Sequence, residues 1–119
     1  MATTTADAPR LVHFIETAGS RLGFVERCAV LSAAAHNPSL ELRLHLRRPN
    51  ASWPEAERPQ PLLANVRFVR LRYRRVFAGT PLAGWYARFA AEQHSEECFT
   101  RFNLGNAARL ALLYRQGCS

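Results

Sequence analysis

A short apolar run near the N-terminus, residues 11–15, is the feature that most constrains the fold of this chain. A short, nearly continuous apolar run is typical of a strand buried on both faces, as in the centre of a parallel sheet. Residues 22–36 follow with the periodicity of an amphipathic helix, which Asn37-Pro38 ends because proline disfavours helical geometry in the preceding residue. The apolar stripe expected on this helix is Phe24, Cys28, Leu31 and Ala35.

Leucines then occupy every second position from Leu40 to Leu46, and polar residues stand between them. This alternation predicts a strand with one buried face. A strand, a helix and a second strand in this order favour an α/β layer with parallel pairing. Parallel sheets bind ligands at the carboxyl ends of their strands, so we expect the ligand edge at residues 16–20.

Two further elements are expected along the rest of the chain. Residues 66–73 predict a third strand, with Val69, Leu71 and Tyr73 on one face and arginines on the other. Residues 107–116 predict a helix, and Gly117 suits the position just after its end. The residues expected to share one side of this helix are Leu110, Leu113 and Tyr114.

The length of 119 residues fits one domain, which we place at residues 10–119 after a small, polar tail at residues 1–9. The N-terminus has neither the basic cluster nor the apolar core of a signal peptide. No apolar run approaches the roughly 18 residues needed to span a bilayer. We therefore expect neither a signal peptide nor a membrane anchor in this sequence.

The formal net charge of +7 favours anionic partners such as nucleic acid, phosphates or an anionic membrane. All of the basic residues are arginine, and they are densest at Arg67, Arg70, Arg72, Arg74 and Arg75. An arginine-rich strand over residues 67–75 could bind nucleic-acid phosphates or another polyanion, with Phe68 and Tyr73 stacking on bases. The same pattern also fits a solvent-facing strand in an arginine-rich sequence.

Three cysteines, Cys28, Cys98 and Cys118, form neither a C-x-x-C motif nor a zinc-finger spacing. His94 and Cys98 stand four residues apart and could bind zinc together with Cys28 or Cys118, but a single pair is a weak zinc signal, and a structural role or no role fits these residues better. The sequence lacks the serine-hydrolase elbow, the P-loop and the dinucleotide-binding glycine motif. From the residues alone, we expect a basic α/β domain that binds a phosphorylated ligand.

Four segments, in order and at suitable spacing, resemble the alpha-1,4-glycosyltransferase family, which includes galactosyltransferases and N-acetylglucosaminyltransferases. They are residues 13–17 (HFIET), 27–34 (RCAVLSAA) with Asn37-Pro38, 65–68 (NVRF) with 80–86 (TPLAGWY), and 106–117 (NAARLALLYRQG). The most specific of these are the Thr-Pro-Leu-x-x-Trp-Tyr stretch and the helix that carries Arg109. The resemblance covers about residues 10–119.

The resemblance implies the nucleotide-sugar-binding half of a Rossmann-like GT-A fold, an α/β architecture. It implies that Phe14, Glu16 and Thr17 border the nucleotide pocket, and that Asn106 and Arg109 contact the donor sugar and its phosphates. A guanidinium suits a diphosphate because it offers two aligned donors and a fixed charge. The family further implies a UDP-sugar donor, a glycan or glycolipid acceptor, manganese in the intact fold and a Golgi location.

The sequence departs from the family pattern at the last segment. Gly105 and Asn106 stand where the family has Ser and Asp, and the family's Asp-x-Asp metal clamp is absent because Asp7 is the single aspartate. Without that clamp, the leaving diphosphate lacks its charge neutralisation. We therefore expect a domain truncated before the Asp-x-Asp motif, without catalytic or metal-binding residues and inactive alone as a hexosyltransferase. Such a half-domain is also expected to self-associate.

Overall fold

The computed structural model describes residues 10–17, 20–59, 63–91 and 98–116, and for residues 98–102 the backbone alone. The described residues form a parallel sheet of three strands in the order β1 (Arg10–Glu16), β2 (Leu40–Leu46) and β3 (Val66–Arg70). In the register of the sheet, Glu16 pairs with Leu46 and Leu46 pairs with Arg70. The three strands therefore end level with one another, at one edge.

One helical layer covers the face of the sheet on which the β2 leucines lie. It consists of α2 (Phe24–His36), between β1 and β2, and α3 (Pro49–Ser52) with the 3-10 turn η1 (Glu55–Glu57), between β2 and β3. The first core lies between this layer and the sheet, where apolar residues of both are buried. Its buried residues are Leu22, Val30, Ala34, Leu42, Leu44, Leu46, Trp53 and Val66.

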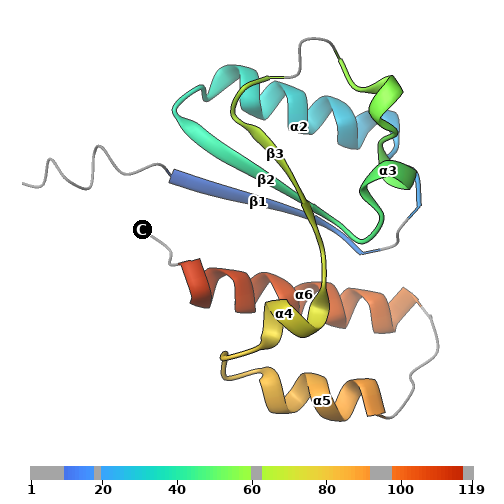
Figure 1. Ribbon diagram of the computed structural model, residues 1–119, viewed down its shortest axis with the longest axis vertical. Coiled ribbons are helices and arrows are strands. Elements are labelled where there is room, and N and C mark those ends of the chain that lie inside the picture. The colour runs from blue at the N-terminus through green and yellow to red at the C-terminus, as the bar shows by residue number, and fades with distance from the viewer. Residues whose placement is uncertain (1–9, 18–19, 60–62, 92–97, 117–119) are drawn as a thin grey trace, which may run out of the picture.

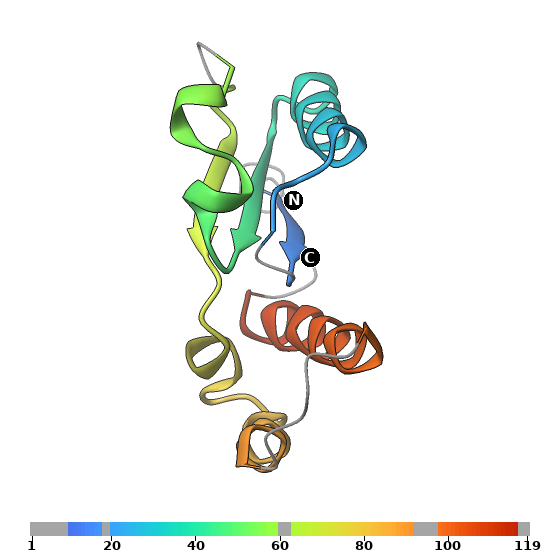
Figure 2. The ribbon, with the colours of Figure 1, turned by 90° about the vertical axis from the view of Figure 1, so that its right-hand side faces the viewer.

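A second group of helices lies at the opposite end of the molecule from α2, with the sheet between them (Figures 1 and 2). It comprises α4 (Tyr73–Phe77), α5 (Ala83–Ala91) and α6 (Cys98–Gln116), and α6 contacts both α4 and β1. Its core contains Phe77, whose ring stacks on Tyr86 with centroids 4.8 Å apart. The other buried members are Leu71, Val76, Ala108, Ala111 and Leu112.

The expected strand–helix–strand start and its parallel pairing are confirmed. The expected burial of the first strand on both faces is wrong, because β1 lies at the edge of the described sheet and its residues after Arg10 are half-buried. The alternation in β2 is confirmed, since Leu42, Leu44 and Leu46 are buried in the first core. The architecture is mixed α/β, a small parallel sheet flanked by helices, and is compatible with a Rossmann-like half-domain.

The predicted third strand is wrong beyond Arg70, because the chain turns into α4 at Tyr73. A helical turn buries the neighbouring residues Val76 and Phe77 together with Leu71 in the second core. An extended chain would point two consecutive side chains to opposite faces of a sheet. The arginine-rich residues 67–75 are therefore not one strand but the end of β3, a connection and part of α4.

The apolar stripe expected on the first long helix is wrong, and the three residues expected to share one side of the last helix do so on its exposed side. On α2 the buried residues are Val30 and Ala34, whereas Phe24 is 74% exposed. On α6 the buried residues include Leu112, whereas Leu110 is 62% exposed. The last helix starts at Cys98 rather than at residue 107, because packing on β1 and α4 overrides the weak helix propensity of a segment that contains Gly105.

The predicted tail at residues 1–9, and Gly117 after the last helix, lie outside the described residues. Within the described ranges, none of the helices combines the length and the apolar character that a membrane span requires.

Candidate functional site

The carboxyl edge of the sheet brings together residues from all three strands. Because the strands end level, Thr17, Arg47 and Leu71 follow them side by side. The Leu71 amide donates to the Leu46 carbonyl at 2.7 Å, which keeps the chain after β3 attached to β2. Ligands of parallel α/β sheets bind outside this edge, so its polar side chains define the candidate site.

Thr17 lies against α6 at Gly105. A Cβ atom placed on Gly105 would stand 3.3 Å from the Thr17 Cγ2 methyl and 3.5 Å from Arg109 Nη1. The first distance is tighter than most Cβ contacts, whereas the second is an ordinary van der Waals contact, so glycine at residue 105 favours the close approach of Thr17 to α6. Segments almost 90 residues apart in the sequence therefore meet at this point.

Arg109 and Asn106 share one side of α6 beside Thr17. Arg109 Nη1 donates a hydrogen bond to Asn106 Oδ1 at 2.9 Å. No carboxylate in the described ranges forms an ion pair with Arg109. Its guanidinium carries five N–H donors, so most of them remain for an anionic ligand.

Arg47 also lies close to Thr17. Its Nη1 atom lies 3.5 Å from the Thr17 carbonyl oxygen, at the outer limit of a hydrogen bond. Two guanidinium groups, that of Arg47 directly after β2 and that of Arg109 on α6, therefore lie near Thr17. Arg47 is not among the site residues that the sequence predicts. The signal that could have found it is its place directly after the β2 leucines, level with Thr17.

Of the other predicted site residues, Phe14 and Glu16 lie on the opposite face of β1 from Thr17. They line a cavity of about 140 Å³ beside α2, together with Leu22, Val30 and Leu44. Side chains alternate between the two faces of a strand, which explains why residues 14 and 16 are together and 17 is apart. The structure thus brings Thr17, Asn106 and Arg109 together and places Phe14 in the first core.

Tyr73 lies near the same edge, at the start of α4. Burial raises the pKa of the Tyr73 hydroxyl to about 12, and the charge of Glu16 contributes to the rise. The hydroxyl is buried and has no hydrogen-bond partner among the described residues. Tyr73 therefore stays neutral at physiological pH and can donate a proton in a hydrogen bond.

Two histidines pair on the sheet face that α2 does not cover. His13 Nδ1 and His45 Nε2 are 2.9 Å apart, so one ring donates to the other. Burial lowers the pKa of His45 to about 4, with smaller contributions from the charges of His13 and Arg43. Burial and Arg43 also lower the pKa of His13. Both rings are therefore neutral at physiological pH.

The donor set for a metal ion is poor in the part of the chain that the structure describes. It contains no group of three or more His, Cys, Asp or Glu side chains that could hold a metal ion. Glu16 brings a carboxylate to the edge of the sheet, but the described residues do not fit the manganese site that the family resemblance implies. Cys28 has a free thiol and is exposed on α2. The side chains of His94, Cys98 and Cys118, the other members of the predicted zinc site, lie outside the described residues.

The nucleic-acid alternative finds no support in the geometry of residues 67–75. Arg67 pairs with Glu41, which also pairs with Arg43 at 2.5 Å, and these contacts lower the pKa of Glu41. Phe68 packs against the first core and has the Arg58 guanidinium over its ring at 3.9 Å. Tyr73 packs against the second core. The two rings expected to stack on bases therefore pack against the protein's own cores.

Comparison with known proteins finds a relative for almost the whole chain. The chain is 35% identical over 116 residues to lactosylceramide 4-alpha-galactosyltransferase of Gorilla gorilla gorilla. The match covers 92% of this chain and 35% of that protein, so the chain spans about a third of the length of its relative. No family model matches the chain, and no solved structure gives a significant match. The similarity indicates an alpha-1,4-galactosyltransferase-like relationship.

Proposed function

We propose that this chain is the donor-binding part of an alpha-1,4-glycosyltransferase-like protein and holds the diphosphate of a UDP-sugar beside Thr17 and Arg109. The observation that carries the proposal is the meeting of Thr17 with Asn106 and Arg109 at the carboxyl edge of a parallel sheet. The galactosyltransferase similarity supports it independently. On the same similarity, we propose that the protein to which this donor-binding part belongs is a Golgi-type protein of GT-A fold. It would act on glycan or glycolipid acceptors.

The chemistry of the three residues suits this ligand. The Arg109 guanidinium can donate two parallel hydrogen bonds to phosphate oxygens, and charge-assisted bonds of this kind are about twice as strong as neutral ones. Asn106 orients the guanidinium by accepting from Nη1, and its amide nitrogen can donate to a sugar hydroxyl. Arg47 adds a second positive charge close to Thr17.

We further propose that these 119 residues bind the donor without transferring its sugar. The sequence contains one aspartate and no Asp-x-Asp motif, and the described residues do not supply a manganese ligand set. The departing diphosphate is therefore left without the charge neutralisation that a bound cation supplies. What the residues can do is bind and orient the donor.

Titration calorimetry of the purified chain with UDP, UDP-galactose and UDP-N-acetylglucosamine tests this function. We expect binding that manganese does not strengthen. Arg109→Gln should weaken it about tenfold or more, because a hydrogen bond to a charged group is worth about 1.5 to 3 kcal/mol.

Arg88→Gln is the matched control, because it removes the same charge from an exposed residue of α5 outside the site. It should leave binding within about twofold, since surface charges far from a ligand are screened by salt. Equal losses in the two variants, or no binding by the parent chain, would contradict the proposed donor site.

A further inference from the structure

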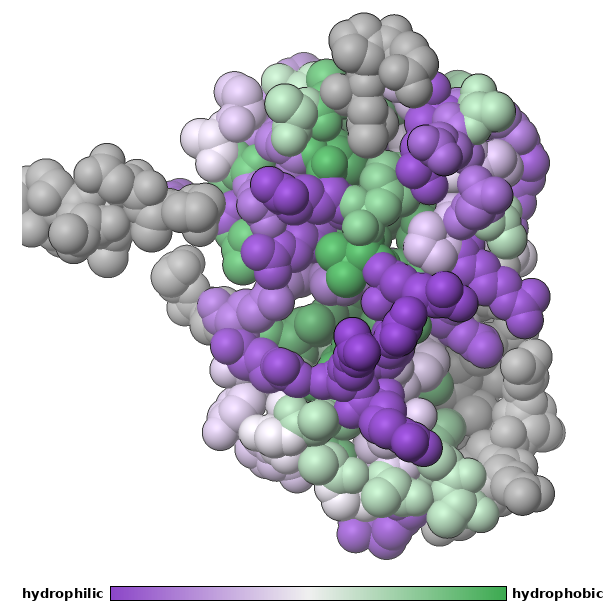
Figure 3. Space-filling view, in the orientation of Figure 1, coloured by the Kyte–Doolittle hydropathy of each residue, from purple (hydrophilic) through white to green (hydrophobic). Residues whose placement is uncertain are grey.

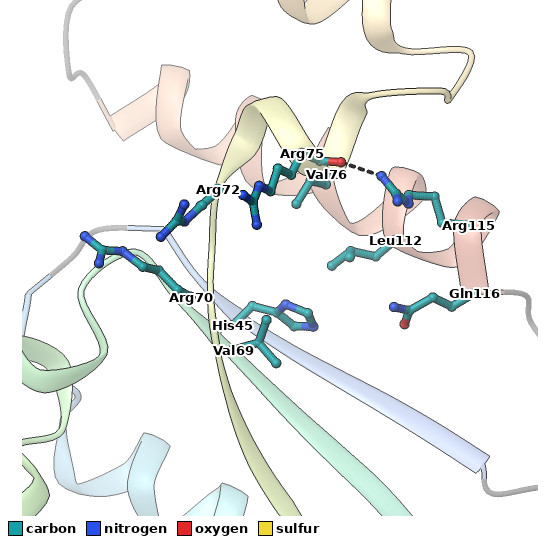
Figure 4. A pocket seen from close by; sticks show the side chains of 9 residues that line it. All are labelled: His45, Val69, Arg70, Arg72, Arg75, Val76, Leu112, Arg115 and Gln116. Atoms are coloured by element: carbon teal, nitrogen blue, oxygen red, sulfur yellow. Dashed lines mark hydrogen bonds between the residues drawn. The ribbon is translucent and has the colours of Figure 1, made fainter.

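A second basic cavity lies away from Thr17, between the sheet, α4 and the last turn of α6. Its volume is about 430 Å³. Figure 4 shows Arg70, Arg72 and Arg75 in a row along one side of it and Gln116 on the other. Val69, Val76 and Leu112 give it an apolar floor. It shares no lining residue with the candidate site around Thr17 and Arg109.

The described residues leave the positive charge of this cavity without a negative partner. Among the described residues, its lining contains four arginines and neither an aspartate nor a glutamate. Arg70, Arg72 and Arg75 are exposed, and none of them forms an ion pair within the described ranges. Arginines elsewhere do find acids, as Arg43 and Arg67 do with Glu41. In Figure 3, strongly hydrophilic side chains gather over the segment that joins β3 to α4.

The fourth arginine, Arg115, stabilises the backbone beside the cavity. Arg115, on α6, donates hydrogen bonds to the carbonyl oxygens of Arg75 and Ala78, the latter at 3.2 Å. These bonds satisfy carbonyls at the end of α4 and tie that helix to α6. These bonds hold the backbone of α4 against α6. The guanidinium groups of Arg72 and Arg75 therefore extend from a backbone that is held in place.

We propose that this cavity binds a compact anion with two or more negative charges, of the pyrophosphate or phosphate-ester class. Like charges held close together repel one another, and a multivalent anion between them replaces that repulsion with attraction. Guanidinium groups match phosphate oxygens in geometry and donate two bonds at a time.

The cavity favours a compact ligand over a nucleic-acid strand. Proteins that bind single-stranded nucleic acid combine a basic groove with aromatic side chains on which the bases stack. Here the aromatic residues of the same segment, Phe68 and Tyr73, pack in the two cores. The basic row is confined to Arg70, Arg72 and Arg75, and the cavity behind it has an apolar floor. The inference does not rest on the proposed donor site, which uses other residues.

Sodium pyrophosphate is the probe for the test, with the full 119-residue chain in titration calorimetry at low ionic strength. The test variant is Arg72→Gln with Arg75→Gln. It removes two guanidinium groups but keeps the Arg75 carbonyl that Arg115 holds. The matched control is Arg74→Gln with Arg88→Gln, which removes the same charge from two exposed residues outside the cavity.

Arg109→Gln is introduced in all three proteins, so that the donor site does not hold the pyrophosphate. In this background we expect the otherwise unchanged chain and the control to bind within about twofold of each other, and the test variant to bind at least about tenfold more weakly. Circular dichroism of each variant checks that it is folded. Arg70→Gln alone is a milder variant, and it should weaken binding even if the double variant unfolds.

Three results would overturn the inference. They are no pyrophosphate binding by the chain that carries Arg109→Gln alone, equal weakening in the test and control variants, and tighter binding of a single-stranded oligonucleotide that displaces pyrophosphate. The last would identify the arginines as part of a nucleic-acid surface. Arg109→Gln separates this site from the donor site, because it should leave cavity binding of pyrophosphate in place while it weakens UDP binding.

Discussion

At the scale of single residues, the placement of a side chain in the sheet decides its protonation. His45 follows the alternation of β2 onto the polar face, yet it is buried to 3% exposure beside His13 and the cationic Arg43. Its pKa is lowered from 6.5 to about 4, so the folded state holds this ring neutral where the unfolded chain would be protonated. The unfolded chain binds more protons in this pH window, so stability must fall as the solution is acidified.

We therefore expect the free energy of unfolding to decrease as the pH falls from 6.5 towards 4. A shift of this size in one histidine corresponds to about 2 to 3 kcal/mol across the window. His45→Gln, which stays uncharged, should flatten most of this slope in urea titrations at a series of pH values. His36→Gln, a change at an exposed histidine of α2, should keep it. An unchanged slope in the His45 variant would show that other groups cause the pH dependence.

At the scale of elements, the contribution of an α6 residue to stability depends on whether it lies on the buried or the exposed face of the helix. Leu112 is 5% exposed in the second core, whereas Leu110, two residues earlier, is 62% exposed. Leu112→Ala should destabilise the chain by about 2 to 5 kcal/mol, because it removes buried methylene groups and leaves a cavity. Leu110→Ala should cost less than about 1 kcal/mol, since surface changes are small. Equal losses in chemical denaturation would show that the helix is rotated from the arrangement described here.

The sequence predicts an element well when neighbouring residues determine it, and poorly when contacts far along the chain do. The alternation of Leu40 to Leu46 sets one face of β2 by itself, and the structure confirms it. The end of β3 and the start of α6 depend on contacts made far along the chain, such as Arg115 with α4, which periodicity cannot show. The same holds for the site: Arg109 was expected there from family resemblance, but its approach to Thr17 depends on tertiary packing at Gly105.

At the scale of the whole molecule, the outer edge of the sheet decides how the chain behaves in solution. Among the described residues, β1 pairs with β2 on one side and with no strand on the other. Phe24 and Val25 of α2 are each 74% exposed, and Tyr114 of α6 is 64% exposed. An unpaired strand edge with apolar surface nearby is a template for association with further chains.

The purified chain should therefore self-associate with increasing concentration in sedimentation velocity experiments. Leu11→Lys, on the half-buried edge strand, should shift it towards monomer, because a charged side chain on an edge opposes strand pairing. Val25→Lys, on α2, tests whether the exposed apolar surface contributes as well. A parent chain that stays monomeric over the full concentration range would show that the edge is not available for pairing.

The proposed position of the donor is the carboxyl edge of the sheet, between Thr17 and Arg109. Its most direct test is a titration of the ¹⁵N-labelled chain with UDP, followed by the amide signals of each residue. We expect the largest shifts at Thr17 and at residues 105–109, with smaller changes on α2. Shifts centred on the cavity beside α2 that Phe14 lines, or none at saturating UDP, would contradict it.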